Sequence, residues 1–267
     1  MRGKIERNGS MRIVIKVGTS TLAHQTGRMN IRHMEDLVKV LSDLKNAGHE
    51  VVLVTSGAIG IGAGKLMLPG RPADMPTKQA AAAVGQCELM YTYDRLFSRY
   101  NHTVAQLLLT REDLEHPQRH ENFQNTICRL LELGALPIIN ENDTVTTEEI
   151  AVGDNDTLGA MVACSIRADL LVLLSDIDGL YTADPRSAPD ARLIPVVKEI
   201  TAEIEALAGE AGSEFGTGGM ATKIRAAKLV SATGADMVII NGETPQLLYQ
   251  VMDNEPVGTR FLGKREE

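Results

Sequence analysis

The sequence predicts an α/β fold with a mostly parallel central sheet and helices on both faces. Three observations predict it. Short continuous apolar runs, such as residues 13–17 and 51–54, suit strands that are buried on both faces. Segments whose apolar residues recur at helical spacing separate these runs. A strand, a helix and a second strand in succession imply a right-handed crossover, and therefore parallel pairing.

The first half of the chain alternates these elements in order. Residues 13–17 (I-V-I-K-V) are the first strand, which ends at Gly18. Apolar residues at helical spacing predict a helix over 31–44, and Gly48 ends it. The second strand is 51–54. The remaining elements of this half are a helix over 78–99, a strand over 104–109, a helix over 122–133 and a strand over 137–139.

The alternation continues in the second half. A helix over 157–166 precedes the apolar run D-L-L-V-L-L, which predicts a strand over 169–174. A glycine-rich stretch at 216–219 leads into a helix over 221–231, and 238–240 is the last strand expected. A weaker strand is predicted at 193–198, and further helices at 201–209 and 244–251. Because neither a linker nor a repeat is evident, we expect one domain over 1–267, with a frayed tail at 1–10.

Composition excludes several functional classes. The formal net charge of −8 argues against binding DNA or an anionic membrane through the overall field. Aromatic residues make up 3% of the chain and Trp is absent, which argues against a base-stacking platform for nucleic acid. No signal peptide or apolar run of about 20 residues is evident. The three cysteines are widely spaced, so we expect reduced thiols and a cytoplasmic protein.

The stretch from Ile138 to Asp156 carries the strongest signal for a site. Two clusters of small acidic and amide side chains follow apolar sequence, and their members are Asn140, Glu141, Asn142, Asp143, Asp154, Asn155 and Asp156. At the carboxyl ends of parallel strands such groups usually face a ligand. One cluster alone would favour a turn built from Asx residues. Two clusters favour a binding site.

Two glycine-rich stretches differ in what they predict. Residues 57–65 (G-A-I-G-I-G-A-G-K) have neither the dinucleotide spacing nor the Ser or Thr that follows a P-loop lysine. There we expect only Ser56 and backbone N–H groups at a helix start to receive an anion. Residues 216–223 (G-T-G-G-M-A-T-K) place Lys223 in the first turn of a helix, which predicts a phosphate cradle. Lys16, near the end of its strand, predicts a second cation for a transferred phosphoryl group.

These stretches resemble a known family. The motifs are I-V-I-K-V-G-T-S (13–20), V-T-S-G-A-I (54–59), I-N-E-N-D (139–143), V-G-D-N-D (152–156), G-L-Y-T-A-D-P-R (179–186) and G-T-G-G-M-A-T-K (216–223). In this order, over about 11–262, they resemble the glutamate 5-kinase branch of the amino acid kinase family. K-V-G-T-S differs from the K-F-G-G-T-S that is typical of aspartokinases.

The resemblance implies a three-layer sandwich of the amino acid kinase type and phosphorylation of the γ-carboxylate of L-glutamate by Mg-ATP, the first step of proline biosynthesis. It implies that Lys16 and Lys223 stabilise the phosphoryl group and that Asp156 orients both. The implied glutamate-binding residues are Ser56, Gly57, Asp143 and Asn155. The implied ATP-binding residues are Lys16, Ser175, Asp176, Thr217, Gly218, Gly219, Met220, Ala221, Thr222 and Lys223.

The resemblance also implies partners, and the chain departs from the family pattern in two respects. Mg²⁺ would be carried by the nucleotide, with no direct protein ligand named. Proline feedback and a homo-oligomer, a dimer or a tetramer, are implied as well. Many members have a C-terminal RNA-modification-type (PUA) domain, and we expect this chain to be a short form without it. Ser175 stands where relatives often have Thr, which keeps the hydroxyl.

The chemistry agrees with this reading, and three alternatives remain. A carboxylate nucleophile with a pKa of about 4.3 is ionised at neutral pH and needs no general base. One alternative is a kinase for N-acetylglutamate or aspartate. Asp143 weighs against the acetylated substrate, because an acidic partner favours a free α-ammonium group. The others are a non-catalytic amino-acid sensor and, least favoured, a dinucleotide-dependent oxidoreductase.

Overall fold

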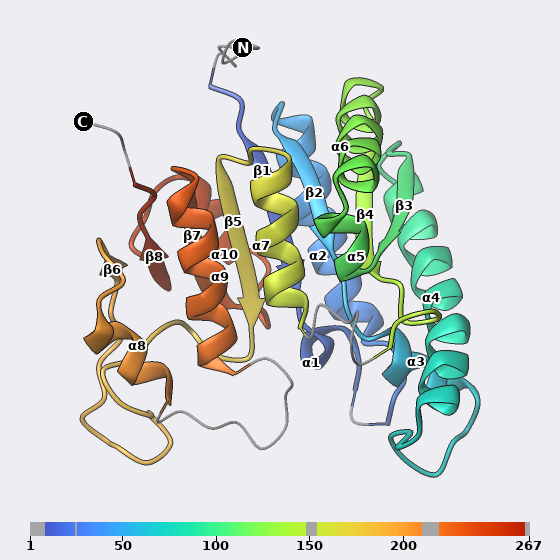
Figure 1. Cartoon of the computed structure of the whole chain (residues 1–267), viewed down its shortest axis with the longest axis horizontal. Helices are drawn as coiled ribbons and strands as arrows, with labels where there is room; N and C mark the ends of the chain where they lie inside the picture. Colours follow the sequence, from blue (N-terminus) through green and yellow to red (C-terminus); the bar gives the residue numbers. More distant parts are fainter. Residues whose placement is uncertain (1–8, 25, 148–153, 210–218, 265–267) are drawn as a thin grey trace.

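The computed structural model describes residues 9–24, 26–147, 154–209 and 219–264. Within these residues one eight-stranded sheet has the order β3-β4-β2-β1-β5-β7-β8-β6 (Figure 1). The strands are β1 Arg12–Val17, β2 Glu50–Val54, β3 Val104–Leu109, β4 Leu136–Glu141, β5 Leu170–Ser175, β6 Val196–Val197, β7 Asp236–Asn241 and β8 Thr259–Phe261. Neighbouring strands are parallel except β7 and β8. The predicted mostly parallel sheet is confirmed.

Helices cover both faces of the sheet, as predicted. They are α1 Thr19–Leu22, α2 Ile31–Asn46, α3 Ala58–Lys65, α4 Met75–Ser98, α5 Arg111–Glu115, α6 Pro117–Glu132, α7 Asn155–Ser165, α8 Ala202–Gly209, α9 Met220–Ala232 and α10 Leu247–Met252. One core cluster joins α6, α7 and α9 to the sheet, and the other joins α2, α4 and α10. In β1, Val14 belongs to the first cluster, whereas Ile13 and Ile15 belong to the second. This alternation is the pleat of a strand buried on both faces.

The main differences from the sequence prediction are short elements. The expectation that 238–240 is the last strand was wrong, because Thr259–Phe261 pairs antiparallel with β7. That strand has only three residues, too few for an alternation to be visible. Two short helices, α1 and α5, were also missed. The helix expected at 122–133 begins earlier, at Pro117, because proline is tolerated in a first turn. The predicted tail at 1–10 lies outside the described residues up to residue 8.

Close packing of α3 on α4 explains Gly62 of the first glycine-rich stretch. A Cβ atom on Gly62 would lie 1.7 Å from the carbonyl oxygen of Ala81. A Cβ atom on Gly85 would lie 1.8 Å from the carbonyl oxygen of Ala58. No side chain fits at these separations, so the backbones of the two helices touch. These glycines therefore serve helix packing, in agreement with their failure to match a nucleotide-binding pattern.

We expect Gly85→Ala to lower the free energy of unfolding by at least about 3 kcal/mol, the upper part of the range for overpacking, because the clash is with backbone. In an unhindered helix interior the same change would stabilise by about 1 kcal/mol. Urea unfolding would measure the difference. Gly70→Ala is the matched control, since a Cβ atom there meets nothing within 4 Å. Equal midpoints for Gly85→Ala and wild type would contradict the expectation.

Candidate functional site

Two lysines meet one buried carboxylate at the carboxyl edge of the sheet. Lys16, near the end of β1, places Nζ 2.6 Å from Oδ1 of Asp156. Lys223, in the first turn of α9, places Nζ 3.0 Å from Oδ2 of the same residue. Thr222 donates a hydrogen bond from Oγ1 to Oδ2 at 3.0 Å. Asp156 is 1% exposed, so this carboxylate is withdrawn from water and held by both cations.

Helix capping places Asp156 where it can bridge the lysines. Asp154 is the N-cap of α7, and its side chain accepts hydrogen bonds from the backbone N–H (2.7 Å) and the hydroxyl (2.9 Å) of Thr157. Asp156 therefore lies in the first turn of α7, where the helix dipole favours a negative charge. The first turns of α7 and α9 and the end of β5 lie at the same edge of the sheet (Figure 1). Residues far apart in sequence are thus brought to one point.

The cluster of Lys16, Lys223 and Asp156 contains more positive than negative charge. Burial raises the pKa of Asp156, but the nearby charges of Lys16 and Lys223 outweigh it and hold the pKa below its usual value. The carboxylate is therefore ionised at neutral pH. Two ammonium groups and one carboxylate leave a net positive charge in a largely dry environment, where charge interactions are stronger than in water. Such a site attracts an anion and can stabilise negative charge that develops on it.

A second polar cluster adjoins the first through Asn155. Its side-chain Nδ2 lies 2.7 Å from the carbonyl oxygen of Thr55, 3.0 Å from Oγ of Ser56 and 3.1 Å from Oδ1 of Asn140. Ser56 in turn donates to the carbonyl oxygen of Val17 at 2.8 Å. Asn155 and Asp156 are consecutive residues that face different partners. The two predicted groups, the phosphate lysines and the substrate residues, are therefore joined at the start of α7.

Asp143 lies on the loop after β4 and lines a narrow cavity of about 10 Å³ with Gln86. Burial and the neighbouring charge of Glu141 raise the pKa of Asp143 to about 6. Sequence reasoning singled out Asp143 but missed Gln86, because a polar residue in the alanine-rich α4 shows no local pattern. Gly57, the remaining predicted substrate residue, is the N-cap of α3 with φ 90°, and its carbonyl oxygen accepts a hydrogen bond from the backbone N–H of Ile61 at 2.9 Å. A left-handed conformation of this kind favours glycine.

The structure describes some, but not all, of the residues predicted to bind the nucleotide. Ser175 ends β5, is buried and donates to Oδ1 of Asp176 at 3.1 Å. Gly219 is the N-cap of α9 without a side-chain cap, and Met220, Ala221, Thr222 and Lys223 form the first turn. Thr217 and Gly218 lie outside the described residues, as does Gly153 of the V-G-D-N-D motif. The described part of the cradle offers backbone N–H groups beside Lys223.

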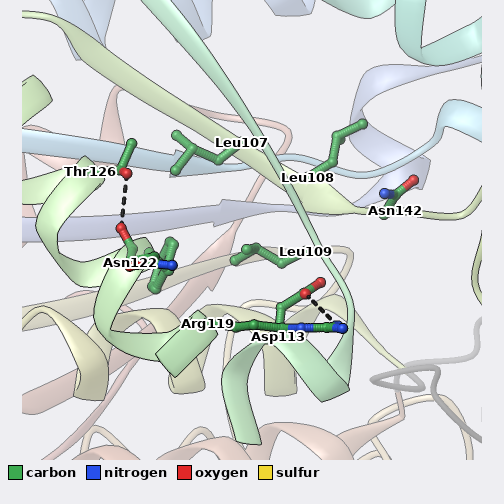
Figure 2. Close-up of a pocket in the computed structure, with 9 residues that line it drawn as sticks. Leu107, Leu108, Leu109, Asp113, Arg119, Asn122, Thr126 and Asn142 are labelled. Atoms are coloured by element: carbon green, nitrogen blue, oxygen red, sulfur yellow. Dashed lines mark hydrogen bonds and ion pairs between the residues drawn. The ribbon is translucent and has the colours of Figure 1, made fainter. Parts of the chain in front are cut away.

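A larger depression of about 450 Å³ lies against the edge strand β3 (Figure 2) and shares Leu108 and Asn142 with the narrow cavity of Asp143. It is lined by Leu107, Leu108, Leu109, Asp113, Arg119, Asn122, Phe123, Thr126 and Asn142. Its charged side chains pair with each other, since Arg119 lies 3.2 Å from Asp113. β4 and β2 separate this strand from β1 and Lys16. The larger hollow is therefore distinct from the lysine cluster.

Comparison with known proteins identifies the family. The profile described as "Amino acid kinase family" matches residues 11–241. The chain belongs to the amino acid kinase family. All of the predicted site residues lie within the matched region, and so do both polar clusters described above.

Curated members of the family are close in sequence. "Glutamate 5-kinase" of Clostridium perfringens is 50% identical over 262 residues, covering 97% of each chain. The enzyme of the same name from Listeria innocua is 51% identical over 97% of this chain and 95% of its own. That of Moorella thermoacetica is 56% identical over 94% of this chain and 66% of its own.

Two solved structures of other kinases share the fold. T. acidophilum isopentenyl phosphate kinase has a TM-score of 0.65 at 19% identity, covering 94% of this chain and 99% of its own. Carbamate kinase from Giardia lamblia, bound to AMP-PNP, has a TM-score of 0.68 at 18% identity, covering 96% and 99%. At this identity the likeness concerns the fold alone. Separately, none of the described helices is long and apolar enough to cross a membrane.

Proposed function

We propose that this chain phosphorylates the γ-carboxylate of L-glutamate with ATP, giving L-glutamyl 5-phosphate, the first step of proline biosynthesis. The observation that carries the proposal is the bridge of Lys16 and Lys223 by Asp156, with ammonium–carboxylate separations of 2.6 and 3.0 Å. The identity of about half to curated glutamate 5-kinases supports it.

The proposed chemistry needs charge stabilisation rather than a base. The γ-carboxylate of glutamate, with a pKa of about 4.3, is already ionised at neutral pH. One of its oxygens attacks the γ-phosphorus of ATP, the bond from that phosphorus to the β–γ bridging oxygen breaks, and ADP leaves. Lys16 and Lys223 offset the negative charge of the two reactants and of the transferred phosphoryl group. Asp156 holds both ammonium groups at one point.

Substrate and nucleotide occupy opposite sides of the lysines in this proposal. Ser56, Gly57, Asn155 and Asp143 bind glutamate, with Asp143 receiving the α-ammonium. Ser175, Asp176 and residues 217–223 bind ATP, whose phosphates approach the N–H groups at the start of α9. Mg²⁺ bound to ATP would offset phosphate charge. Both oxygens of Asp156 are paired with lysines, so this carboxylate is already engaged. Mg²⁺ in nucleotide sites takes most of its ligands from phosphates and water and needs only one or two carboxylates, which fits an ion carried by the nucleotide.

ATP-dependent formation of an acyl phosphate, trapped as a hydroxamate with hydroxylamine, tests the proposal. L-Glutamate, L-aspartate and N-acetyl-L-glutamate would be compared with and without Mg²⁺. We expect a signal with L-glutamate and Mg²⁺. A signal with another acid would change the substrate, and silence with all three despite ATP binding would favour a sensor.

The raised pKa of Asp143 gives a pH-dependent prediction. Its folded pKa of about 6 exceeds its ordinary value of 3.8, so ionisation opposes folding. The cost appears as pH rises from about 4 to about 6 and is complete above that. Asp143→Asn is therefore expected to raise the melting temperature of the ligand-free protein at about pH 8, with no difference at about pH 4. The same variant is expected to bind L-glutamate at least about tenfold more weakly, because a charged hydrogen bond is lost.

Differential scanning calorimetry and titration calorimetry would measure these effects. Asp113→Asn is a control for which the opposite change in melting temperature is expected. Partial burial raises the pKa of Asp113, but hydrogen bonds from Thr110 and the contact with Arg119 leave it below the usual value. That variant is expected to lower the melting temperature. A fall for Asp143→Asn at both pH values would contradict the prediction.

The remaining partner predictions are also proposals. We expect a homo-oligomer, and the edge strand β3 supports it, because Leu107, Leu108 and Leu109 line an open depression beside an unpaired strand edge within the described sheet. Light scattering would give the mass in solution. Inhibition by proline would be tested by adding L-proline to the hydroxamate assay. A cytoplasmic location remains a prediction from the widely spaced cysteines.

A further inference from the structure

Gln86 carries a buried amide nitrogen that no other described residue satisfies. The residue lies in α4 with 8% of its surface exposed. Its Oε1 accepts a hydrogen bond from Asn140 at 2.9 Å, whereas its Nε2 is buried and has no partner in the described part of the chain. A buried donor without an acceptor is destabilising, and such groups in native proteins call for an explanation.

The carbonyl oxygen of Thr55 determines the orientation of the side-chain amides of Asn155, Asn140 and Gln86. The carbonyl oxygen of Thr55 can only accept, so the Asn155 atom 2.7 Å from it must be Nδ2. That nitrogen also faces Asn140 at 3.1 Å, so the facing atom of Asn140 is its Oδ1. The other end of Asn140 then donates to Gln86. The chain of hydrogen bonds therefore ends with Nε2 of Gln86 as a donor.

Gln86 and Asp143 line the same narrow cavity, together with Glu141, Asn142 and Thr144. Its volume of about 10 Å³ has room for about one water, so a larger ligand would lie across its opening and not inside it. The two side chains offer opposite chemistry. Asp143 accepts hydrogen bonds and, when ionised, attracts a cation. Nε2 of Gln86 only donates, so it selects an anion or a carbonyl oxygen. A group that bears an ammonium and a carboxylate on one carbon satisfies both, and that is the α-carbon of a free amino acid.

We propose that Gln86 is a specificity-determining residue, whose Nε2 donates a hydrogen bond to the α-carboxylate of the substrate while Asp143 receives the α-ammonium. This inference rests on the proposed function and names the recognition of that same site. The proposal places the α-carbon of the substrate at the end of the series of hydrogen bonds that runs from Asn155 through Asn140 to Gln86. The γ-carboxylate then extends toward Asp156 and the two lysines, since Asn155 and Asp156 are consecutive residues.

Gln86→Glu is the sharpest variant, because it keeps the size and the acceptor for Asn140 but replaces the donor by an anionic oxygen. L-Glutamate would be compared with 4-aminobutyrate, which keeps the ammonium and the reacting carboxylate but lacks the α-carboxylate. We expect kcat/KM for L-glutamate to fall by about tenfold to a hundredfold, mainly through KM. For 4-aminobutyrate, as a substrate or a competitive inhibitor, we expect a change below about threefold, since the lost contact does not exist there.

Two further variants complete the design. Gln86→Met has a similar length but neither donor nor charge, and about a tenfold loss with L-glutamate alone is expected. Gln250→Glu adds the same charge at an exposed position of α10 and is expected to leave the binding of both ligands unchanged. Thermal unfolding would show that each variant is folded. Should Gln86→Glu fold poorly, Gln86→Met carries the test.

The outcomes separate this inference from the proposed function. Equal losses with L-glutamate and 4-aminobutyrate, or a fall in kcat at constant KM, would show a merely structural Gln86 and overturn the inference alone. A wild-type protein that forms no hydroxamate from L-glutamate would overturn the proposed function and this inference with it. A loss confined to ligands that carry an α-carboxylate supports both.

Discussion

Replacing Lys223 by alanine is expected to lower kcat by about a thousandfold, with little change in the affinity for L-glutamate. The ammonium lies 3.0 Å from Asp156 and is buried, so water screens its charge only weakly. Removing a preorganised positive group from the transferring phosphoryl raises the barrier of the chemical step. In the proposed function the binding of L-glutamate depends mainly on other residues, which the substitution leaves in place.

Steady-state kinetics and titration calorimetry with L-glutamate would separate these two effects. Lys228→Ala is the matched control, because Lys228 lies on the same helix but is exposed and pairs with Glu205 at the surface. Its kcat is expected to stay within about twofold of the wild type, since surface ion pairs contribute little. Lys16→Ala is expected to behave like Lys223→Ala. Full turnover in both lysine variants would contradict their assignment to the phosphoryl group.

Asp156→Asn is expected to lower the free energy of unfolding by about 3–5 kcal/mol, the cost of leaving a buried charge without its partner. The amide cannot offset the two ammonium groups, which would then repel each other across a short distance. We expect the turnover of the variant to fall as well, because the lysines lose their common anchor. Urea unfolding at neutral pH would measure the stability.

The pH dependence gives this prediction a second check. The pKa of Asp156 is held below its ordinary value of 3.8, so its contribution to stability is present above that value and is lost as pH falls through the folded pKa. The difference between wild type and variant should therefore persist down to about pH 4 and shrink below it. Asp154→Asn is the control, since Asn caps a helix about as well as Asp. Similar losses for both substitutions would indicate a general effect on the start of α7.

Local sequence determined most of the regular structure. The apolar runs of β1, β2 and β5 are long enough to be recognised, and their burial on both faces follows from the lack of polar alternation. The short strand β8 was not predictable, because its three residues pair through a register that only the folded sheet provides. The glycines of α3 could be excluded as a nucleotide loop, but the use of Gly62 in packing on α4 depends on a contact between helices.

The sequence by itself determined the chemical types at the candidate site: two lysines, clustered carboxylates and amides, and glycines before a helix. Only the tertiary structure decided that Asp156 bridges lysines on β1 and α9, because that meeting requires the sheet to bring strand ends and helix starts to one edge. It alone also brought Gln86 of α4 to Asp143. Sequence patterns record which face of an element is buried, whereas the unsatisfied donor of Gln86 is a property of the groups that surround it in space.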